Sequence, residues 1–280
     1  MVRTPARVPT LVLAALTLGV VAPAAVWAGA LDLTVSGNEV SGTIDLAGGL
    51  GADLDLRFEQ VVGLTVANLG AAVQSIDPLD LSLAGRLPSG VAIPAAFPVR
   101  LVVEPPASGG LSFSGVYTLA LHTHNLEFTA GCPLRLFKAS GGGTFEDITD
   151  SIGMGSYRAG ATGGGFSEFL IVADTRPIAS VVAAKFDAVE DLLATHGGVI
   201  SAAVVDDLAD LILGARAYYQ AGEVVQAAQT VDAFVALVKA QSGTAIPDVW
   251  RASRDLVDVA GLLRAAGATL RFSLNLASAG

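Results

Sequence analysis

The chain has 280 residues, of which 52% are hydrophobic, a formal net charge of −10 and a single cysteine. An acidic chain with scattered charges repels phosphate backbones, so no nucleic-acid partner is expected. One cysteine excludes an intrachain disulfide, so stability must come from a hydrophobic core. The apolar content is sufficient for one large domain or two small ones.

The N-terminal segment has the layout of a secretory signal peptide. Arg3 and Arg7 precede an apolar run from Leu11 to Val21, which proline and small residues follow. This order predicts a signal peptide over residues 1–28, with cleavage near residues 28–30. The run is shorter than the roughly 20 residues of a membrane-spanning helix, and no second run of that length follows. We therefore expect a periplasmic or extracellular mature chain without a membrane span.

Residues 31–174 are predicted to form an antiparallel β-sandwich, because short alternating runs of strand length are separated by glycine and proline. The predicted strands are LDLTVSG, NEVSGTIDL, GADLDLRFEQ, FPVRLVVEPP, LSFSGVYTLALHTH, CPLRLFKA and GFSEFLIVAD. A short helical turn is expected at residues 80–86. A closed barrel is the alternative, since periodicity does not distinguish it from a sandwich.

From Thr175 onward, apolar residues recur at steps of three and four, the spacing of one helical face. The four stripes are Ile178, Val182, Phe186, Val189 and Leu193; Val204, Leu208, Leu211, Ala215 and Tyr218; Val224, Ala228, Val231, Val235 and Val238; and Val249, Ala252, Leu256, Val259, Leu263, Ala266 and Leu270. Pro247 is expected to open the fourth helix. Four amphipathic helices with short links predict an antiparallel bundle over residues 175–272, followed by a short tail at residues 273–280. The predicted fold class is therefore α+β in two domains.

The helical half resembles the FIMAH-type domain, a small all-helical module of secreted bacterial proteins that is not itself known to be catalytic. The matching positions are Gly198, Val199, Ile200, Leu208, Leu211, Ala215, Gly222, Ala227, Ala228, Phe234, Val238, Gly243 and Ile246. The resemblance covers roughly residues 185–266 and departs from the pattern at Pro247 to Trp250. It consists of packing and turn positions, so it implies a fold and no activity.

The end of the strand half is similar to the final strands of immunoglobulin-like sandwiches in exported bacterial proteins. The residues that carry this similarity are Phe145, Asp147, Ile148 and Thr149, then Phe166, Ser167 and Phe169. The whole chain also resembles an uncharacterised family of two-domain exported proteins of Gram-negative bacteria. That resemblance implies a compartment and no reaction.

His122 and His124 are the candidate metal ligands, within the stretch LALHTHNLEF. In a strand, alternation turns the apolar residues of this stretch toward the core and both histidines toward solvent. Zinc needs a third and usually a fourth ligand, and neither Glu127 nor Glu146 can be placed from the sequence. Two solvated histidines are therefore favoured over a metal centre.

Other clusters give weaker signals. Asp53 and Asp55 share a strand face, which favours a solvated acidic edge. Glu146, Asp147 and Asp150 flank a turn and are better calcium candidates, although no calcium-binding loop motif is present. No nucleophile motif occurs, and the glycine runs do not open helices as phosphate-binding loops do. We predict no catalytic residue and no cofactor.

Trp250 and Tyr219 are the candidate binding residues. Trp250 is the only tryptophan that remains after the predicted cleavage, and it can alternatively fill the domain interface. Tyr218 lies on the apolar stripe and is expected in the core, which leaves Tyr219 for an exposed patch. The favoured function is an exported, non-enzymatic interaction or adhesion-type protein whose partner is an unknown protein or a cell-surface polysaccharide. The alternatives are a carbohydrate-binding accessory module and a metal-dependent hydrolase that uses His122 and His124.

Overall fold

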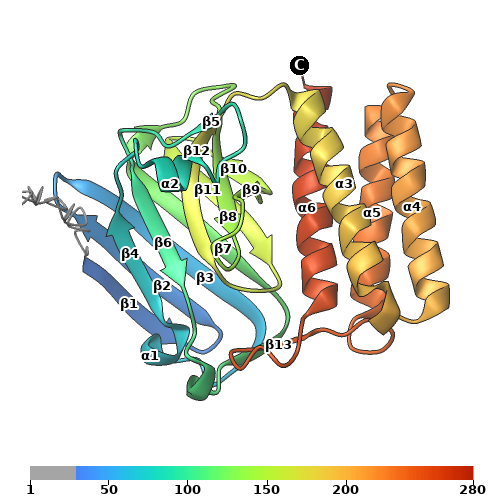
Figure 1. Cartoon of the computed structure of the whole chain (residues 1–280), viewed down its shortest axis with the longest axis horizontal. Helices are drawn as coiled ribbons and strands as arrows, with labels where there is room; N and C mark the ends of the chain where they lie inside the picture. The colour runs from blue at the N-terminus through green and yellow to red at the C-terminus, as the bar shows by residue number, and fades with distance from the viewer. Residues whose placement is uncertain (1–29, 280) are drawn as a thin grey trace, which may run out of the picture.

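The computed structural model describes residues 30–279, so the predicted signal peptide at residues 1–28 lies outside the described residues. The fold is α+β: two sheets of antiparallel strands occupy one side of the molecule, and long helices occupy the other (Figure 1). No helix within the described part of the chain has the length and apolar character of a membrane span.

The first sheet contains seven strands in the order β1-β2-β3-β7-β11-β10, with β13 also paired to β7. Their bounds are β1 Ala30–Ser36, β2 Glu39–Leu46, β3 Leu50–Val62, β7 Ser112–Glu127, β10 Ser151–Gly153, β11 Ser156–Gly163 and β13 Val249–Arg251. Buried and exposed side chains alternate along β2 and β3, as the sequence pattern predicts for strands with one face toward a core. The sheet therefore has one apolar face and one polar face over these strands.

The second sheet has the order β4-β6-β12-β8-β9, with β5 also paired to β12. Its strands are β4 Ala71–Ser75, β5 Val91–Ala92, β6 Val99–Val103, β8 Leu134–Ala139, β9 Glu146–Asp147 and β12 Glu168–Asp174. The short helices α1 (Val66–Leu69) and α2 (Leu81–Ala84) lie in its connections, the second of them inside the turn expected at residues 80–86. The two sheets face each other, and their inner faces share one hydrophobic core.

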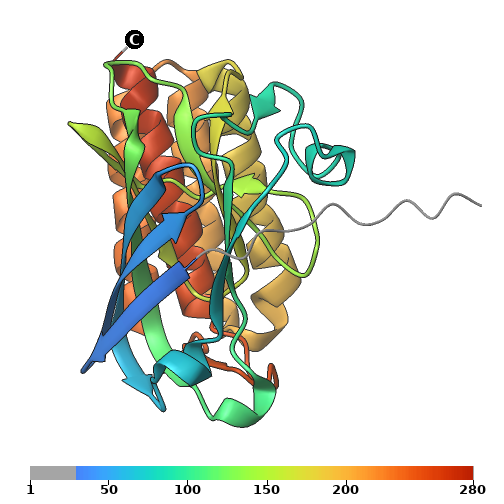
Figure 2. The ribbon, with the colours of Figure 1, turned by 90° about the vertical axis from the view of Figure 1, so that its left-hand side faces the viewer.

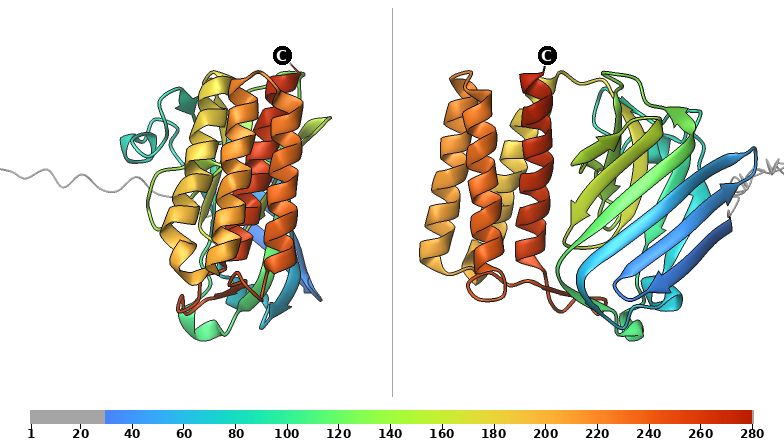
Figure 3. Two further views of the ribbon diagram at one scale, coloured as in Figure 1. Left: turned by 90° about the vertical axis from the view of Figure 1, so that its right-hand side faces the viewer. Right: turned by 180° about the vertical axis from the view of Figure 1, so that it is seen from behind.

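Four long helices follow the strands: α3 Ile178–His196, α4 Ala202–Gln220, α5 Val224–Gln241 and α6 Val259–Ser278. They share a second core, which includes Phe186, Leu208, Phe234 and Leu263. The inner helices α3 and α6 lie next to the sheets, and α4 and α5 lie on the outside (Figures 2 and 3). Helix α6 contacts β11 and β7, so the helices cover the side of the sheets where β9 and β11 lie.

The structure corrects the fourth predicted helix. Helix α6 begins at Val259 instead of Pro247, because the side chain of Asp258 caps it by accepting the Gly261 N–H at 2.7 Å. The preceding residues return to the first sheet as β13, and Leu256 lies in the link with 38% of its surface exposed. At its other end α6 continues to Ser278, through most of the predicted tail.

Candidate functional site

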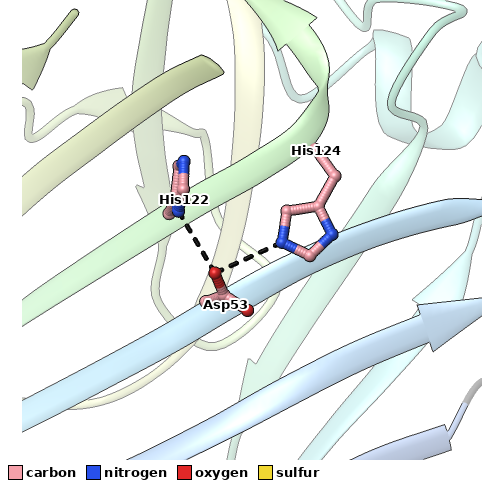
Figure 4. Close-up of side chains that lie close together, drawn as sticks. All are labelled: Asp53, His122 and His124. Atoms are coloured by element: carbon pink, nitrogen blue, oxygen red, sulfur yellow. Dashed lines mark hydrogen bonds and ion pairs between the residues drawn. The ribbon is translucent and has the colours of Figure 1, made fainter. Parts of the chain in front are cut away.

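The sheet register brings Asp53 and the two histidines together. Asp53 on β3 is paired directly with His122 on β7, so both side chains lie on the outward face of the first sheet. The Asp53 Oδ2 atom is 3.1 Å from His122 Nδ1 and 3.2 Å from His124 Nε2 (Figure 4). One atom from each residue lies within 4.8 Å of the other two. Asp53 is therefore a third candidate ligand, which the sequence alone did not connect with the histidines.

The start of β3 and the end of β7 leave room for the His124 ring. Gly51 lies below its ring, and a Cβ atom there would come within 2.8 Å of His124 Nδ1. The side chain of Asn125 accepts the Gly51 N–H at 2.9 Å and donates to the Gly49 carbonyl at 3.0 Å. The absence of a side chain at Gly51 therefore lets the His124 ring lie over β3 toward Asp53.

Ser156 holds the other ring nitrogen of His122. A register shift between Ser156 and Arg158 on β11 brings the Ser156 Oγ within 2.6 Å of His122 Nε2. A histidine that binds metal through one nitrogen commonly uses the other in a hydrogen bond that fixes its tautomer and ring orientation. Ser156 occupies that supporting position for a ligand at His122 Nδ1.

The electrostatics of Asp53 favour a carboxylate. The hydrogen bond from His124 and the neighbouring imidazoles lower the pKa of Asp53 below its usual value, even though partial burial opposes this. An ionised carboxylate and two imidazoles form the donor set of many zinc and other divalent transition-metal sites. Two ligand atoms that share a tetrahedral zinc ion are about 3.3 Å apart, which is close to both measured separations.

Solvent can reach the cluster. The side chains of His122, Asp53 and His124 are 27%, 43% and 51% exposed. Three protein ligands leave at least one coordination position open in a four-coordinate site. None of the three residues lines the large cleft between the sheets and the inner helices.

His122 and His124 lie on one outward face of β7, as the alternation in the sequence predicts. The same alternation indicated an acidic edge at Asp53 and gave no connection between Asp53 and the histidines. The calcium candidates do not converge: Asp147 forms an ion pair with Lys185 at 2.7 Å, and Asp150 accepts a hydrogen bond from Thr162 at 2.7 Å.

Trp250 has a packing role instead of the binding role expected for it. It lies on β13 opposite Phe113, is only 9% exposed, and stacks on the Phe113 ring at 5.2 Å. Its edge meets Phe166 at 5.4 Å. The indole is thus part of the core between the sheets, where little of it is available to a partner.

For the two tyrosines at the end of α4, the exposed and the packed residue are the reverse of those expected. Tyr218 is 42% exposed, while Tyr219 packs against the helical core with its ring 6.1 Å from that of Phe186. The buried stripe of α4 passes through Ile212 and Ala215. A further step of four reaches Tyr219, whereas the predicted step of three reached Tyr218.

The fold and the cluster define an α+β protein with two antiparallel sheets, a helical region and an outward-facing group of two histidines and one aspartate. The chain belongs to a family of unknown function, DUF6689, whose model matches residues 13–278. This match spans both the sheets and the helices. No curated protein and no solved structure matches the chain.

Proposed function

We propose that this chain is an exported, non-enzymatic binding protein whose first sheet holds a divalent transition-metal ion through Asp53, His122 and His124. The observation that carries the proposal is the convergence of three ligand atoms of suitable chemistry on one face. Ser156 forms a hydrogen bond with the other ring nitrogen of His122, which is an outer contact that metal sites use, and Gly51 leaves room for the His124 ring.

The remaining parts of the proposal come from the sequence. Export rests on the signal-peptide pattern of residues 1–28. An immunoglobulin-like sandwich over residues 31–174 and a FIMAH-like antiparallel four-helix bundle over residues 175–272 are the finer fold descriptions that we propose. The partner would be a protein or a cell-surface polysaccharide, since the net charge of −10 disfavours nucleic acid.

A metal-dependent hydrolase is the second candidate. It is favoured by the same three ligands, because a fourth position left to water is a feature of catalytic zinc sites. The three side chains are 27–51% exposed, so the protein does not exclude water from the cluster as enclosed catalytic sites do, which is why we place metal binding first.

The test is a calorimetric titration of the full mature chain with Zn²⁺, together with measurement of the metal that copurifies. We expect one ion per chain, and an affinity lowered by about 100-fold or more in the His122→Ala, His124→Ala double variant. Asp53→Asn should weaken binding as well, since it removes the charge and keeps the shape. Binding should also weaken at acidic pH, because protonated imidazole is not a ligand.

His196→Ala is the matched control, because this third histidine lies at the end of α3, in the helical region. Equal zinc affinity in the wild type and the double variant would exclude the site. Tight binding without hydrolysis of model esters and phosphoesters would favour the binding protein over the hydrolase.

A further inference from the structure

A cleft of about 800 Å³ opens between the sheets and the inner helices, away from Asp53 and the histidines. One wall comes from the second sheet and the residues around β9, and from the end of β11. Helices α3 and α6 form the opposite wall. This volume lies within the range of sites that enclose small organic ligands, and such sites occur preferentially where two structural units meet.

Two contacts join the walls of the cleft and fix the distance between them. At one end Gly164 touches the backbone of Gly261, so closely that a Cβ atom at Gly164 would lie 2.5 Å from it. At the other end Lys185 on α3 is buried and pairs with Asp147 at 2.7 Å.

Small side chains keep the helical wall of the cleft open. Ala184 and Ala188 are one turn apart on α3, and Ala265 and Ala266 lie on α6. A methyl group does not reach across to the sheet, so the space is left unfilled. The alanines give this wall an apolar surface suited to an aliphatic chain.

Lys138 supplies the cation of the cleft. It extends from β8, and its ammonium donates a hydrogen bond to the Gly165 carbonyl. The other lining cations are already paired, Lys185 with Asp147 and Arg176 with Asp174. Within residues 30–279, Lys138 forms no ion pair. Burial lowers the pKa of the Lys138 ammonium to about 8, although the nearby Glu146 raises it.

We propose that this cleft binds a monocarboxylate with an aliphatic body, whose carboxylate pairs with Lys138 and whose chain lies against the alanines of α3 and α6. One cation matches one negative charge. Glu146, Asp187 and Asp191 also line the cleft, and Glu146 is paired across the strands with Lys138. Their carboxylates repel anionic groups elsewhere in the cleft, which disfavours phosphates and dicarboxylates. The site would therefore select ligands by the number of their negative charges as well as by their aliphatic chain.

The test is a titration of the full mature chain with octanoate, beside uncharged octanol and the dicarboxylate octanedioate. We expect one octanoate per chain and weaker binding of both comparison compounds. Lys138→Met should lower octanoate affinity by about 10-fold or more, because it removes the charge and keeps the length. Ala188→Leu should lower it similarly by filling the cleft.

Matched controls exist for both changes. Lys239→Met alters an exposed lysine on α5, and Ala183→Leu enlarges an exposed alanine on α3 that does not line the cleft. Both should bind octanoate as the wild type does. Circular dichroism of each variant shows whether it has folded.

A direct readout comes from the three lysines of the chain, Lys138, Lys185 and Lys239. After reductive methylation with a ¹³C label, the Lys138 signal should titrate at higher pH when octanoate is present. No octanoate binding, equal binding of octanol, or an unmoved Lys138 titration would each overturn the proposal. Zinc binding at Asp53, His122 and His124 is measured separately, so either proposal can fail alone.

Discussion

Two groups of polar residues, which we call junctions, join the helices to the sheets. They differ in whether each buried ionisable side chain has a partner. The first junction consists of Lys185, Asp147, Thr269, Ser273 and Thr149. Its lysine ammonium pairs with Asp147 at 2.7 Å and also donates to Thr269 Oγ1 at 2.6 Å and Ser273 Oγ at 2.9 Å. Thr269 in turn donates to the Thr149 carbonyl at 2.8 Å. Each buried charge at this junction thus has a partner of opposite sign.

The second junction consists of Glu59, Arg264 and Asp258. Arg264 on α6 pairs with Glu59 on β3 through two contacts of 2.7 and 2.8 Å. Asp258 is fully buried, and its Oδ2 atom has no hydrogen-bond partner among the described residues. Desolvation raises the pKa of Asp258 to about 8, although the Gly261 N–H and Arg264 oppose this. The second junction thus contains a buried acid, Asp258, that changes charge near neutral pH.

The largest expected effect is at the first junction. Asp147→Ala leaves the Lys185 ammonium buried without its counter-charge, so the free energy of unfolding should fall by about 3–5 kcal/mol. Chemical denaturation at pH 7 measures this change. Lys185→Met combined with Asp147→Ala should restore much of the loss, because neither charge then remains buried. A double variant as unstable as Asp147→Ala would show that the packing of the aspartate, and not the ion pair, dominates there.

The second effect concerns pH. In the folded chain Asp258 keeps its proton up to about pH 8, whereas the ordinary pKa in the unfolded chain is 3.8. The folded state therefore binds more protons between these values, and its stability falls as pH rises through this window. Asp258→Asn keeps the cap and cannot ionise, so it should remove up to about 4 kcal/mol of pH dependence between pH 5 and 8.

Denaturation of both proteins across that range measures the effect, with Asp248→Asn as a comparison at a nearby carboxylate. If wild type and Asp258→Asn follow parallel curves, Asp258 is ionised in the folded chain. The two junctions would then not differ in the way described.

The smallest effect tests the link before α6. Leu256 is 38% exposed, so Leu256→Ala should cost less than about 1 kcal/mol, unlike a residue on a buried helical stripe. Leu263→Ala, at a position on α6 with no exposed surface, should cost about 2–5 kcal/mol. Thermal denaturation of the two variants, measured side by side, compares their losses of stability. Equal losses would mean that the link packs as tightly as the helix.

Seven strands and three of the four long helices could be predicted because their periods are local; the strands are β1, β2, β3, β6, β7, β8 and β12. The alternation in β7 placed His122 on the outward face, and steps of three and four located Phe186 in the helical core. Strand β11 was missed because SYRAGATG is too rich in glycine and alanine to show an apolar face. Because β11 was not predicted, Ser156 could not be recognised as a hydrogen-bond partner of His122.

The cluster of Asp53, His122 and His124 and the fourth helix could not be completed from sequence for a different reason. Asp53 meets His122 only through the register of two strands almost seventy residues apart, which no local pattern encodes. Val249 and Leu256 continue the helical spacing of α6 by coincidence, since one belongs to a strand and the other to an exposed link. Asp258 ahead of Val259 was the available signal for the true helix start.

Strand β13 also joins a late part of the chain to the first sheet. It returns from the helices to pair with β7 (Figure 1). Its Trp250 ring stacks on Phe113 and meets Phe166 edge-on. A chain made from its N-terminus has already produced α3, α4 and α5 before this ring becomes available. A product that stops before Trp250 therefore keeps apolar surface open to solvent, where proteases and chaperones recognise incomplete chains.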